Sequence, residues 1–276
     1  MKRKDLTKIP LSMPAAKSSR THDSLEPGRL SFRCNICDWL GWTRIETLDR
    51  EGPSCERCKS SVRLRAIIHI LSIELFGRSL SISEFPDRPD IVGLGISDWE
   101  VYAAGLQRKF NYTNTYYHQE PKLDLRAIDR KLEGTMDFVI ATDVFEHIAP
   151  PISTAFESVR RILKPNGVFV FSVPYAKEGE ETIEHFAQLH NYEVLEREGN
   201  HILRNVTEDG VEQIFDRLVF HGGIGSTLEM RLFSESSLMR EFQQAGFGRI
   251  KIYKEPDFDH GIFWQLDWSL PLSARV

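Results

Sequence analysis

The chain has 276 residues, of which 41% are hydrophobic, enough for one large globular domain and a small appended module. No apolar run approaches the roughly 20 residues of a membrane-spanning helix. No apolar stretch follows the basic residues 1–4 either, so we expect no secretory signal and a cytoplasmic protein. Residues 1–33 hold eight Lys and Arg against three Asp and Glu and so carry a charge of +5. Because the net charge of the chain is −5, the other 243 residues together carry −10. Extended nonspecific contact with RNA or DNA is therefore disfavoured.

The first segment, residues 1–33, is rich in Lys, Ser and Pro and lacks apolar periodicity. This composition predicts a poorly ordered tail that closes with a strand over 30–33.

Residues 34–60 contain all four cysteines, as Cys34-x2-Cys37 and Cys55-x2-Cys58 with seventeen residues between the pairs. This spacing is typical of two knuckles around a tetrahedral metal site, and disulfides are rare in the cytosol. We therefore expect a structural Zn²⁺ in a small zinc-ribbon-like module. A redox-active dithiol is the alternative.

A helix is predicted over 61–76, ending at Gly77. It is apolar around more than half of its circumference, so we expect it to lie on the main sheet and to join the zinc module to it. Within it, His69 is interpreted as a packed core residue rather than a ligand. Three residues between the knuckles are expected to pack against the metal site or the main domain: Trp39, Leu40 and Trp42.

From Asp90 onward apolar runs alternate with helical patterns, which predicts an α/β fold with a mainly parallel sheet and crossover helices. The expected strands are 91–94, 112–117, 137–142 and 168–173, and the expected helices are 99–109 and 152–163. Only about 20 residues separate Tyr117 from Asp137. This leaves little room for a full helix–strand–helix passage, so we expect it to be missing or abbreviated there.

The less regular residues 176–232 are interpreted as an inserted cap or hairpin. Within them, the runs 201–206 and 211–219 flank Asp209-Gly210, a strong hairpin-turn signal. A helix is predicted over 235–245, then strands over 249–254 and near 262–270. These last two strands are expected to form an antiparallel pair that completes the sheet.

The first strand of this domain runs into Gly93-Leu94-Gly95, a turn typical of a nucleotide-like ligand at the carboxyl end of a strand. A dinucleotide fingerprint needs a glycine at the sixth position, where Asp98 stands, and a carboxylate aimed at a pyrophosphate would repel it. No Gly-Lys-Ser/Thr follows, which argues against a P-loop. S-adenosylmethionine, an adenosine ligand without phosphates, fits such a turn.

Four segments together resemble the class I S-adenosylmethionine-dependent methyltransferases. They are GLGIS at 93–97, LDL at 123–125, FVIATDVFEHI at 138–148 and ILKPNGVFVFSVP at 162–174. The resemblance covers 90–174 well and 233–270 more loosely. It implies a Rossmann-like methyltransferase domain over 61–276 that uses S-adenosylmethionine.

Carried over to this sequence, the resemblance implies that Gly93, Leu94 and Gly95 line the methionine end of the cofactor. Asp124 and Leu125 would contact the adenine. Asp143 would close the fourth strand beneath the cofactor.

The acidic residue that usually holds the ribose has three candidates, of which Glu120 is preferred over His118 and Gln119. The sequence also departs from the family pattern at Ile91, where an acid is common, and at Ser97, where a third glycine is common. These departures motivate one alternative, a binding or scaffold protein on a degenerate methyltransferase fold.

His147, one turn past Asp143, is the expected general base or substrate contact. Tyr175 is expected to face the acceptor pocket, and His221 with the glycine-rich residues after it is expected to recognise the substrate. Alternatively, Asp143, Glu146 and His147 could hold a divalent ion, as related quinone-type O-methyltransferases suggest.

No Asn/Asp-Pro-Pro-Tyr/Phe follows the fourth strand. By the resemblance, this absence argues against exocyclic amines of bases and glutamine, and for an O-, C- or other N-acceptor in a small molecule, glycan or lipid. The alternative is an RNA methyltransferase that presents its substrate on the zinc module, because a basic cluster follows the second knuckle: Arg57, Lys59, Arg63 and Arg65. No sequence pattern indicates an oligomeric state.

Overall fold

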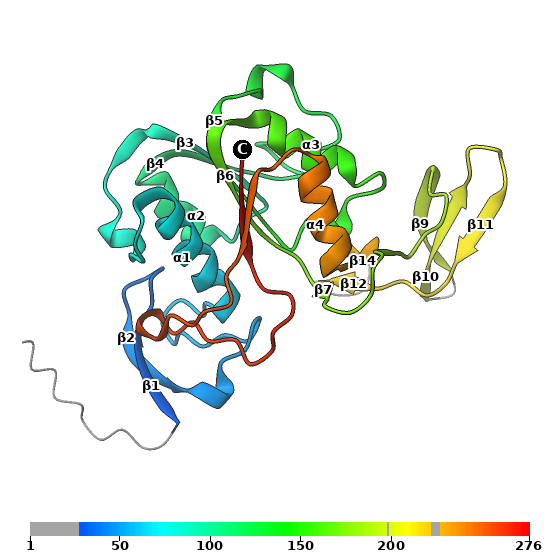
Figure 1. The fold of residues 1–276 in the computed structure, drawn as a ribbon. Coiled ribbons are helices and arrows are strands. Elements are labelled where there is room, and N and C mark those ends of the chain that lie inside the picture. Colours follow the sequence, from blue (N-terminus) through cyan, green and yellow to red (C-terminus); the bar gives the residue numbers. More distant parts are fainter. Residues whose placement is uncertain (1–27, 198, 222–226) are drawn as a thin grey trace, which may run out of the picture.

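The computed structural model describes residues 28–197, 199–221 and 227–276, and its centre is a six-stranded sheet in the order β15-β16-β6-β5-β3-β4 (Figure 1). Neighbours among β3, β4, β5 and β6 pair in parallel, whereas β16 runs antiparallel to both β6 and β15. The strands are β3 (Arg88–Ile96), β4 (Phe110–Thr115), β5 (Met136–Thr142), β6 (Leu163–Ser172), β15 (Arg249–Ile252) and β16 (Leu272–Arg275). The predicted mainly parallel sheet with a terminal antiparallel pair is confirmed.

The sheet ends at β4, as the short passage after Tyr117 predicts. Beyond β4 the chain forms a loop, in which Tyr116 pairs with Lys122, and a short 3-10 helix, η3 (Arg130–Leu132), before it enters β5. The predicted last strand near 262–270 is wrong. That segment is irregular, follows η5 (Phe258–His260), and places aromatic side chains in the cavity described below, while the strand itself comes later as β16.

Two helices cover each face of the sheet (Figure 1). On one face lie α1 (Val62–Phe76) and α2 (Glu100–Gln107), and on the other α3 (Ser153–Ile162) and α4 (Glu235–Gln244). The predicted helix α1 begins where the Ser61 side chain accepts a hydrogen bond from Leu64 N, and it ends at Gly77 with φ 72°. No helix within the described ranges has the length and apolarity to cross a membrane.

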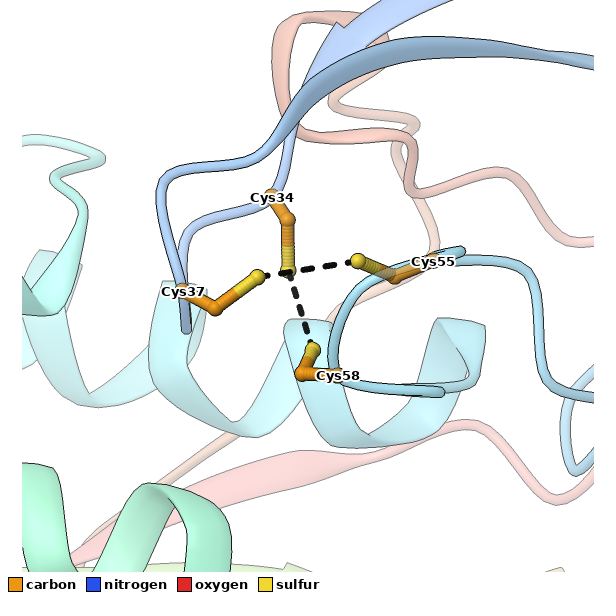
Figure 2. A group of neighbouring side chains, drawn as sticks. All are labelled: Cys34, Cys37, Cys55 and Cys58. Atoms are coloured by element: carbon orange, nitrogen blue, oxygen red, sulfur yellow. Dashed lines mark hydrogen bonds between the residues drawn. The ribbon is translucent and has the colours of Figure 1, made fainter.

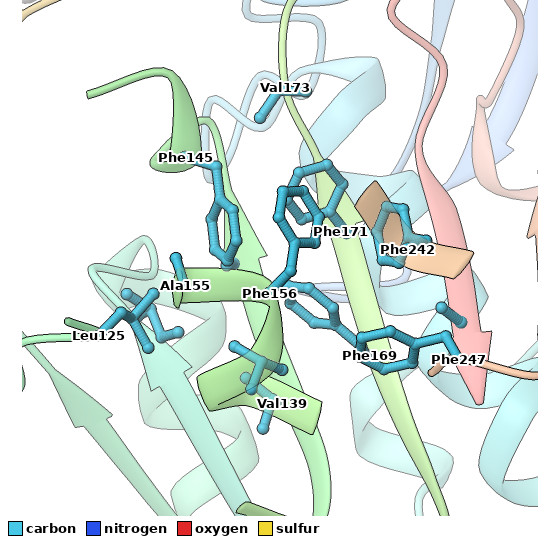
Figure 3. Close-up of a cluster of buried hydrophobic side chains, with 14 of the residues drawn as sticks. Leu125, Val139, Phe145, Ala155, Phe156, Phe169, Phe171, Val173, Phe242 and Phe247 are labelled. Carbon is cyan, nitrogen blue, oxygen red and sulfur yellow. The ribbon is translucent and has the colours of Figure 1, made fainter. Parts of the chain in front are cut away.

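The face covered by α3 and α4 is packed with phenylalanines (Figure 3). Edge-to-face pairs join Phe145 to Phe156, with ring centroids 4.8 Å apart, and Phe156 to Phe242, 5.0 Å apart. Because Phe145 opens the 3-10 helix η4 (Phe145–His147), this core anchors the turn that carries Glu146 and His147.

The residues between β6 and α4 form short strands outside the main sheet. One small sheet has the order β7-β14-β8, a second β11-β10-β9, and a third pairs β12 with β13. Their bounds are β7 (Tyr175–Ala176), β8 (Ile183–Glu184), β9 (Asn191–Arg197), β10 (Asn200–Val206), β11 (Glu212–Phe215), β12 (Phe220–His221), β13 (Thr227–Leu228) and β14 (Arg231–Ser234). The predicted hairpin at Asp209-Gly210 joins β10 to β11, with φ 85° at Gly210. The second sheet projects from the body of the protein (Figure 1).

The cysteine module begins with an antiparallel pair, β1 (Arg29–Arg33) and β2 (Leu40–Arg44), followed by the 3-10 helix η1 (Ile45–Thr47). Its packing rests on Arg65 of α1, which is fully buried and donates to Ser60 O at 2.8 Å and to Gly261 O at 2.7 Å. The module, α1 and the C-terminal loop therefore form one packed unit. Of the expected tail over 1–33, residues 1–27 lie outside the described residues, and the predicted closing strand over 30–33 is confirmed as β1.

The three apolar residues between the knuckles differ in their packing. Trp39 packs edge to face on Phe32, at 5.7 Å between ring centroids. Leu40 and Trp42 are exposed, which contradicts the prediction, because a two-stranded ribbon leaves one face to solvent. Arg29 stacks on the Trp42 ring.

His69 of α1 is only partly buried. Its Nδ1 lies 2.7 Å from Ser79 Oγ and 2.9 Å from Asp257 Oδ2. It therefore belongs to a polar cluster and is not a purely packed core residue.

Candidate functional site

A cavity of about 1460 Å³ opens at the carboxyl ends of β3, β4 and β5, where ligands bind in open α/β sheets. Six parts of the chain line it. They are the cysteine module (Asp49, Arg50, Glu51) with the start of α1 (Arg63), the sheet edge (Ile96, Ser97, Thr142, Asp143), the loop after β4 (His118, Gln119, Leu123, Asp124, Leu125), the turn after β5 (Val144, His147, Ile148), the inserted strands (Tyr192, His221, Leu228) and the C-terminal loop (Phe263, Trp264, Trp268).

Of the expected cofactor contacts, Asp124, Leu125 and Asp143 line the cavity. Glu120 does not, whereas its neighbours His118 and Gln119 do. The reason is local, because the Glu120 carboxylate accepts a hydrogen bond from Lys122 N at 3.0 Å within its own turn.

Gly93, Leu94 and Gly95 lie inside β3, and the cavity is lined by the next residues, Ile96 and Ser97. A Cβ at Gly93 would lie 2.1 Å from the Phe138 ring, and one at Gly95 would lie 1.9 Å from Tyr112 Oη. These glycines are therefore required by packing against neighbouring strands. Ser97 has φ 56°, a left-handed conformation that glycine adopts without strain.

Gly95→Ala is expected to lower the free energy of unfolding by about 1–3 kcal/mol, because the new methyl group overlaps the Tyr112 hydroxyl. The same methyl group would lie 2.5 Å from Asp98 Oδ2, so both partners of a buried hydrogen bond would have to move. Urea unfolding measures the loss. Gly248→Ala is the matched control, since nothing lies within 4 Å of its Cβ position. Equal losses at Gly95 and Gly248 would contradict this account.

Asp98, the residue at the sixth position of the glycine turn, does not face the ligand. Its side chain is buried beneath the turn, where the Tyr112 hydroxyl donates to Oδ2. The Asp98 carboxylate would therefore not point at a pyrophosphate bound at this turn, which contradicts the prediction. Burial raises the pKa of Asp98 to about 7.

Asp98→Asn is expected to stabilise the protein at pH 8 by about 1–2 kcal/mol. Because the pKa of Asp98 is raised in the folded state, its contribution to stability is full below the unfolded-state value of 3.8 and is lost as the pH rises toward about 7. Asparagine does not ionise, so the variant does not lose stability as the pH rises, and its side-chain oxygen can still accept the hydrogen bond from Tyr112. Urea unfolding at pH 5 and pH 8 is the measurement, and a variant less stable than wild type at pH 8 would refute the prediction.

Asp143, at the end of β5, is held by two arginines from the cysteine module and the start of α1. Arg50 donates to both carboxylate oxygens, at 2.8 and 2.9 Å, and Arg63 Nε lies 3.1 Å from Oδ2. Ser172 donates to Oδ1 at 2.9 Å. Burial alone would raise the pKa of Asp143, but the two guanidinium groups outweigh it and hold the pKa below its ordinary value. Both oxygens are thus engaged, so the alternative in which Asp143 ligates a metal loses its support.

The same contacts break up the basic cluster expected after the second knuckle. Arg65 is buried, and Arg63 is paired with Glu51 and with Asp143. Only Arg57 and Lys59 of the four remain exposed. The sequence does not indicate a role for Arg50, because its partner Asp143 lies 93 residues away.

His147 and His221 come together at the cavity, with ring centroids 4.7 Å apart and planes at 89°. Burial lowers the pKa of His147, so its imidazole is neutral near pH 7. Buried Arg231, missed in the sequence, holds η4 in place by donating to Phe145 O at 2.9 Å and to Ile148 O at 2.6 Å. The glycine-rich residues 222–226 lie outside the described residues.

Tyr175 does not face the cavity as expected. It is buried, and its hydroxyl accepts a hydrogen bond from Leu270 N at 3.2 Å. Burial raises the pKa of Tyr175 to about 12. The side chain therefore anchors the C-terminal loop at Leu270 and does not line the cavity.

The four cysteines converge from two turns (Figure 2). The sulfur atoms of Cys34 and Cys58 are 3.7 Å apart, and those of Cys37 and Cys55 are 3.6 Å apart. A tetrahedral zinc site with Zn–S bonds of about 2.3 Å has sulfur–sulfur edges of about 3.8 Å. The donor set and its spacing therefore fit a zinc ion.

Comparison with known proteins gives one family match, described as a methyltransferase domain, over residues 77–251. No curated protein sequence matches. Among solved structures, the chain is 15% identical to 1,6-didemethyltoxoflavin-N1-methyltransferase of Burkholderia thailandensis, over 77% of each chain with a TM-score of 0.43. It is 13% identical to the sugar N-methyltransferase KedS8 of Streptoalloteichus sp. ATCC 53650, over 78% of this chain and 87% of that one with a TM-score of 0.44. The family match includes the strands β3, β4 and β5, whose ends form the sheet edge of the cavity.

Proposed function

The chain belongs to the methyltransferase-domain family and is a methyltransferase, and from this premise we propose that it methylates a hydroxyl or amine of a small-molecule, glycan or lipid acceptor with S-adenosylmethionine as donor. The observation that carries the proposal is the cavity at the sheet edge. Its volume of about 1460 Å³ exceeds the about 300–1,000 Å³ of an ordinary ligand pocket. It therefore has room for a cofactor and an acceptor together.

The cofactor is assigned to the part of the cavity beside β3 and β4. Asp124 and Leu125 are proposed adenine contacts, and His118 and Gln119 replace Glu120 as candidates for the ribose. Gly93, Leu94 and Gly95 contribute by shaping β3 beneath this part. When bound, S-adenosylmethionine supplies a methyl group whose bond to sulfur breaks as the acceptor attacks, leaving the electron pair on sulfur.

The acceptor is assigned to the part beside His147 and His221. A neutral imidazole can take the proton that an attacking hydroxyl or ammonium group must lose. The aromatic side chains of Phe263, Trp264 and Trp268 line the same cavity and offer flat apolar faces to a ring-shaped acceptor. Alignment of the two reactants in one cavity supplies much of the remaining acceleration.

For the cysteine module we propose a structural zinc. Four thiolates leave no open coordination position, so the metal itself does not contact substrate. Its effect on the site passes through Arg50 and Arg63, which the module and the start of α1 place on Asp143. The RNA alternative is disfavoured, because two of the four basic residues on which it relied are engaged inside the protein.

Calorimetry with S-adenosylhomocysteine tests the cofactor assignment. Asp124→Ala should weaken binding about 10-fold or more, because a hydrogen bond to a charged group is worth about 1.5–3 kcal/mol. Glu120→Ala is the matched control from the same loop and should bind like wild type. If the wild-type protein binds neither S-adenosylmethionine nor S-adenosylhomocysteine, the proposal fails.

A cell extract supplied with labelled S-adenosylmethionine tests transfer and would reveal the class of acceptor. Wild-type protein should label a small molecule, glycan or lipid fraction, and RNase treatment should leave the label unchanged. Label that RNase releases would favour the RNA alternative. Cofactor binding without any labelled product would favour the scaffold alternative.

A further inference from the structure

Three side chains at the acceptor part of the cavity, Glu146, His147 and His221, place one ligand atom each within 4.8 Å of the other two. We infer that these residues bind one divalent transition-metal ion, in addition to the zinc proposed for the cysteines. The inference of metal binding stands on the geometry of the three side chains alone. The role of the ion in activating an acceptor rests on the proposed function.

The first observation is the buried carboxyl group of Glu146. Its side chain is 1% exposed, and neither of its oxygens has a hydrogen-bond partner among the described residues. Oε1 lies 3.6 Å from His147 Nε2 and 3.9 Å from His221 Nδ1, both too far for a hydrogen bond. A buried polar group without a partner is costly, and a cation between these three atoms would satisfy it.

The second observation is that each imidazole is held in place by a contact to the ring nitrogen that lies away from Glu146. His147 Nδ1 lies 2.8 Å from Leu228 O, so it carries the proton, and the lone pair of its Nε2 faces Glu146. His221 Nε2 lies 2.8 Å from the carboxylate of Glu229, which assigns its proton to Nε2 and a lone pair to Nδ1. His185 Nε2 lies 2.8 Å from the other Glu229 oxygen. Metal-binding histidines are commonly held in this way, through a carbonyl or carboxylate on the far nitrogen.

The result is two lone pairs and a carboxyl group turned toward one another. A single proton on Glu146 would still leave one of its two buried oxygens without a partner, whereas a metal ion accepts all three donors. Two imidazoles and a carboxylate form a donor set suited to Zn²⁺ and its divalent neighbours. A tetrahedral site with bonds of about 2.1 Å has edges of about 3.4 Å. The two nitrogens lie 3.6 and 3.9 Å from Glu146 Oε1, so these two edges require only a small approach.

The contrast with the other histidine cluster supports this choice. His69, Asp257 and His260 also lie together, but there Asp257 Oδ2 already accepts from Ser79 at 2.7 Å and from His260 at 2.8 Å. Hydrogen bonds explain that cluster fully. They do not explain the environment of Glu146.

The open side of the site faces the cavity, since His147 and His221 line it and Glu146 does not. With the ion bound, both imidazoles serve as ligands and not as the general base, and a hydroxyl of the acceptor could complete the coordination and lose its proton to solvent at a lower pH than in water. Its oxygen would then attack the methyl carbon, and the electron pair of the breaking carbon–sulfur bond would leave with sulfur. No oxidation or reduction is involved, so a redox-inert ion suffices.

The test is the metal content of the full-length protein, measured after incubation with excess zinc and gel filtration. Wild type should retain two equivalents, whereas His221→Asn and Glu146→Gln should each retain one. His221→Asn is the safer variant for folding, because the His221 side chain is 36% exposed. His190→Asn, an exposed histidine of the same insertion, should retain two.

Cobalt substitution shows which of the two metal sites is lost in the variant. The intense thiolate-to-cobalt absorption of the cysteine site should be equal in wild type and His221→Asn, and only the weaker ligand-field bands of a nitrogen and oxygen site should disappear. Wild type with a single equivalent would overturn the inference, as would a variant that keeps both ions. Because metal is counted without cofactor or acceptor, a protein that holds two ions but transfers no methyl group would contradict the proposed function and leave the metal site intact.

Discussion

Cys34→Ser is expected to release one metal ion per chain and to lower the free energy of unfolding by more than about 3 kcal/mol. The magnitude follows from the apparent binding free energy of structural zinc, about 10 kcal/mol or more, most of which is folding energy in so small a module. Cys34 is fully buried beside Ser60, so the loss also disturbs the turn to which Arg65 donates. Metal analysis and urea unfolding measure the two effects.

Leu40→Ser is the control for this prediction. Leu40 belongs to the same module but is 75% exposed on β2, so the variant should keep its zinc and its stability. A Cys34→Ser protein with unchanged metal content and an unchanged unfolding midpoint would show that the four thiols do not hold a structural ion.

Asp143→Asn is expected to lower the free energy of unfolding by about 3 kcal/mol, because Arg50 and Arg63 would lose the charge that compensates them in a largely buried position. Asparagine tolerates the left-handed conformation at this position, φ 52°, so the backbone is preserved. Urea unfolding at pH 7 measures the loss.

The pH dependence of this loss follows from the lowered pKa of Asp143. A carboxyl group with a lowered pKa stabilises the fold above its unfolded-state value of 3.8, and this contribution is lost as the pH falls through the folded-state pKa. The difference between wild type and variant should therefore shrink in acid. Asp267→Asn, which removes an exposed ion pair with Lys177, should cost less than about 1 kcal/mol at any pH. Equal losses at the two positions would contradict the account of Asp143.

The sequence predicts those parts of the fold whose signals are local. The helix after the second knuckle is marked by its apolar periodicity and by Gly77, and the hairpin by Asp209-Gly210. The cysteine spacing predicts a cluster that the structure brings together. The predicted strand near 262–270 is wrong, because the apolar residues of this segment face a cavity and do not alternate across a sheet.

The candidate site is less accessible from the sequence, because it is made by contacts between distant residues. His147 and His221 were predicted separately, but their pairing depends on a strand that returns 74 positions later. Arg50 and Arg231 belong to no motif, and their roles exist only through partners on other segments. The prediction that Tyr175 faces the acceptor pocket fails for the same reason, because the backbone that it anchors, at Leu270, is remote in sequence.

The contacts between the cysteine module and the C-terminal loop bear on how the protein is made. Arg65 cannot bond Gly261, Arg50 cannot bond Ser269, and the carbonyl of Leu48 cannot accept from Gln265 until about 200 further residues have been made. The ribosome releases the cysteines long before these partners exist. With the proposed zinc the module can form early, but its side facing the C-terminal loop stays uncovered until residues 261–269 have been made, so the cavity cannot be complete before then.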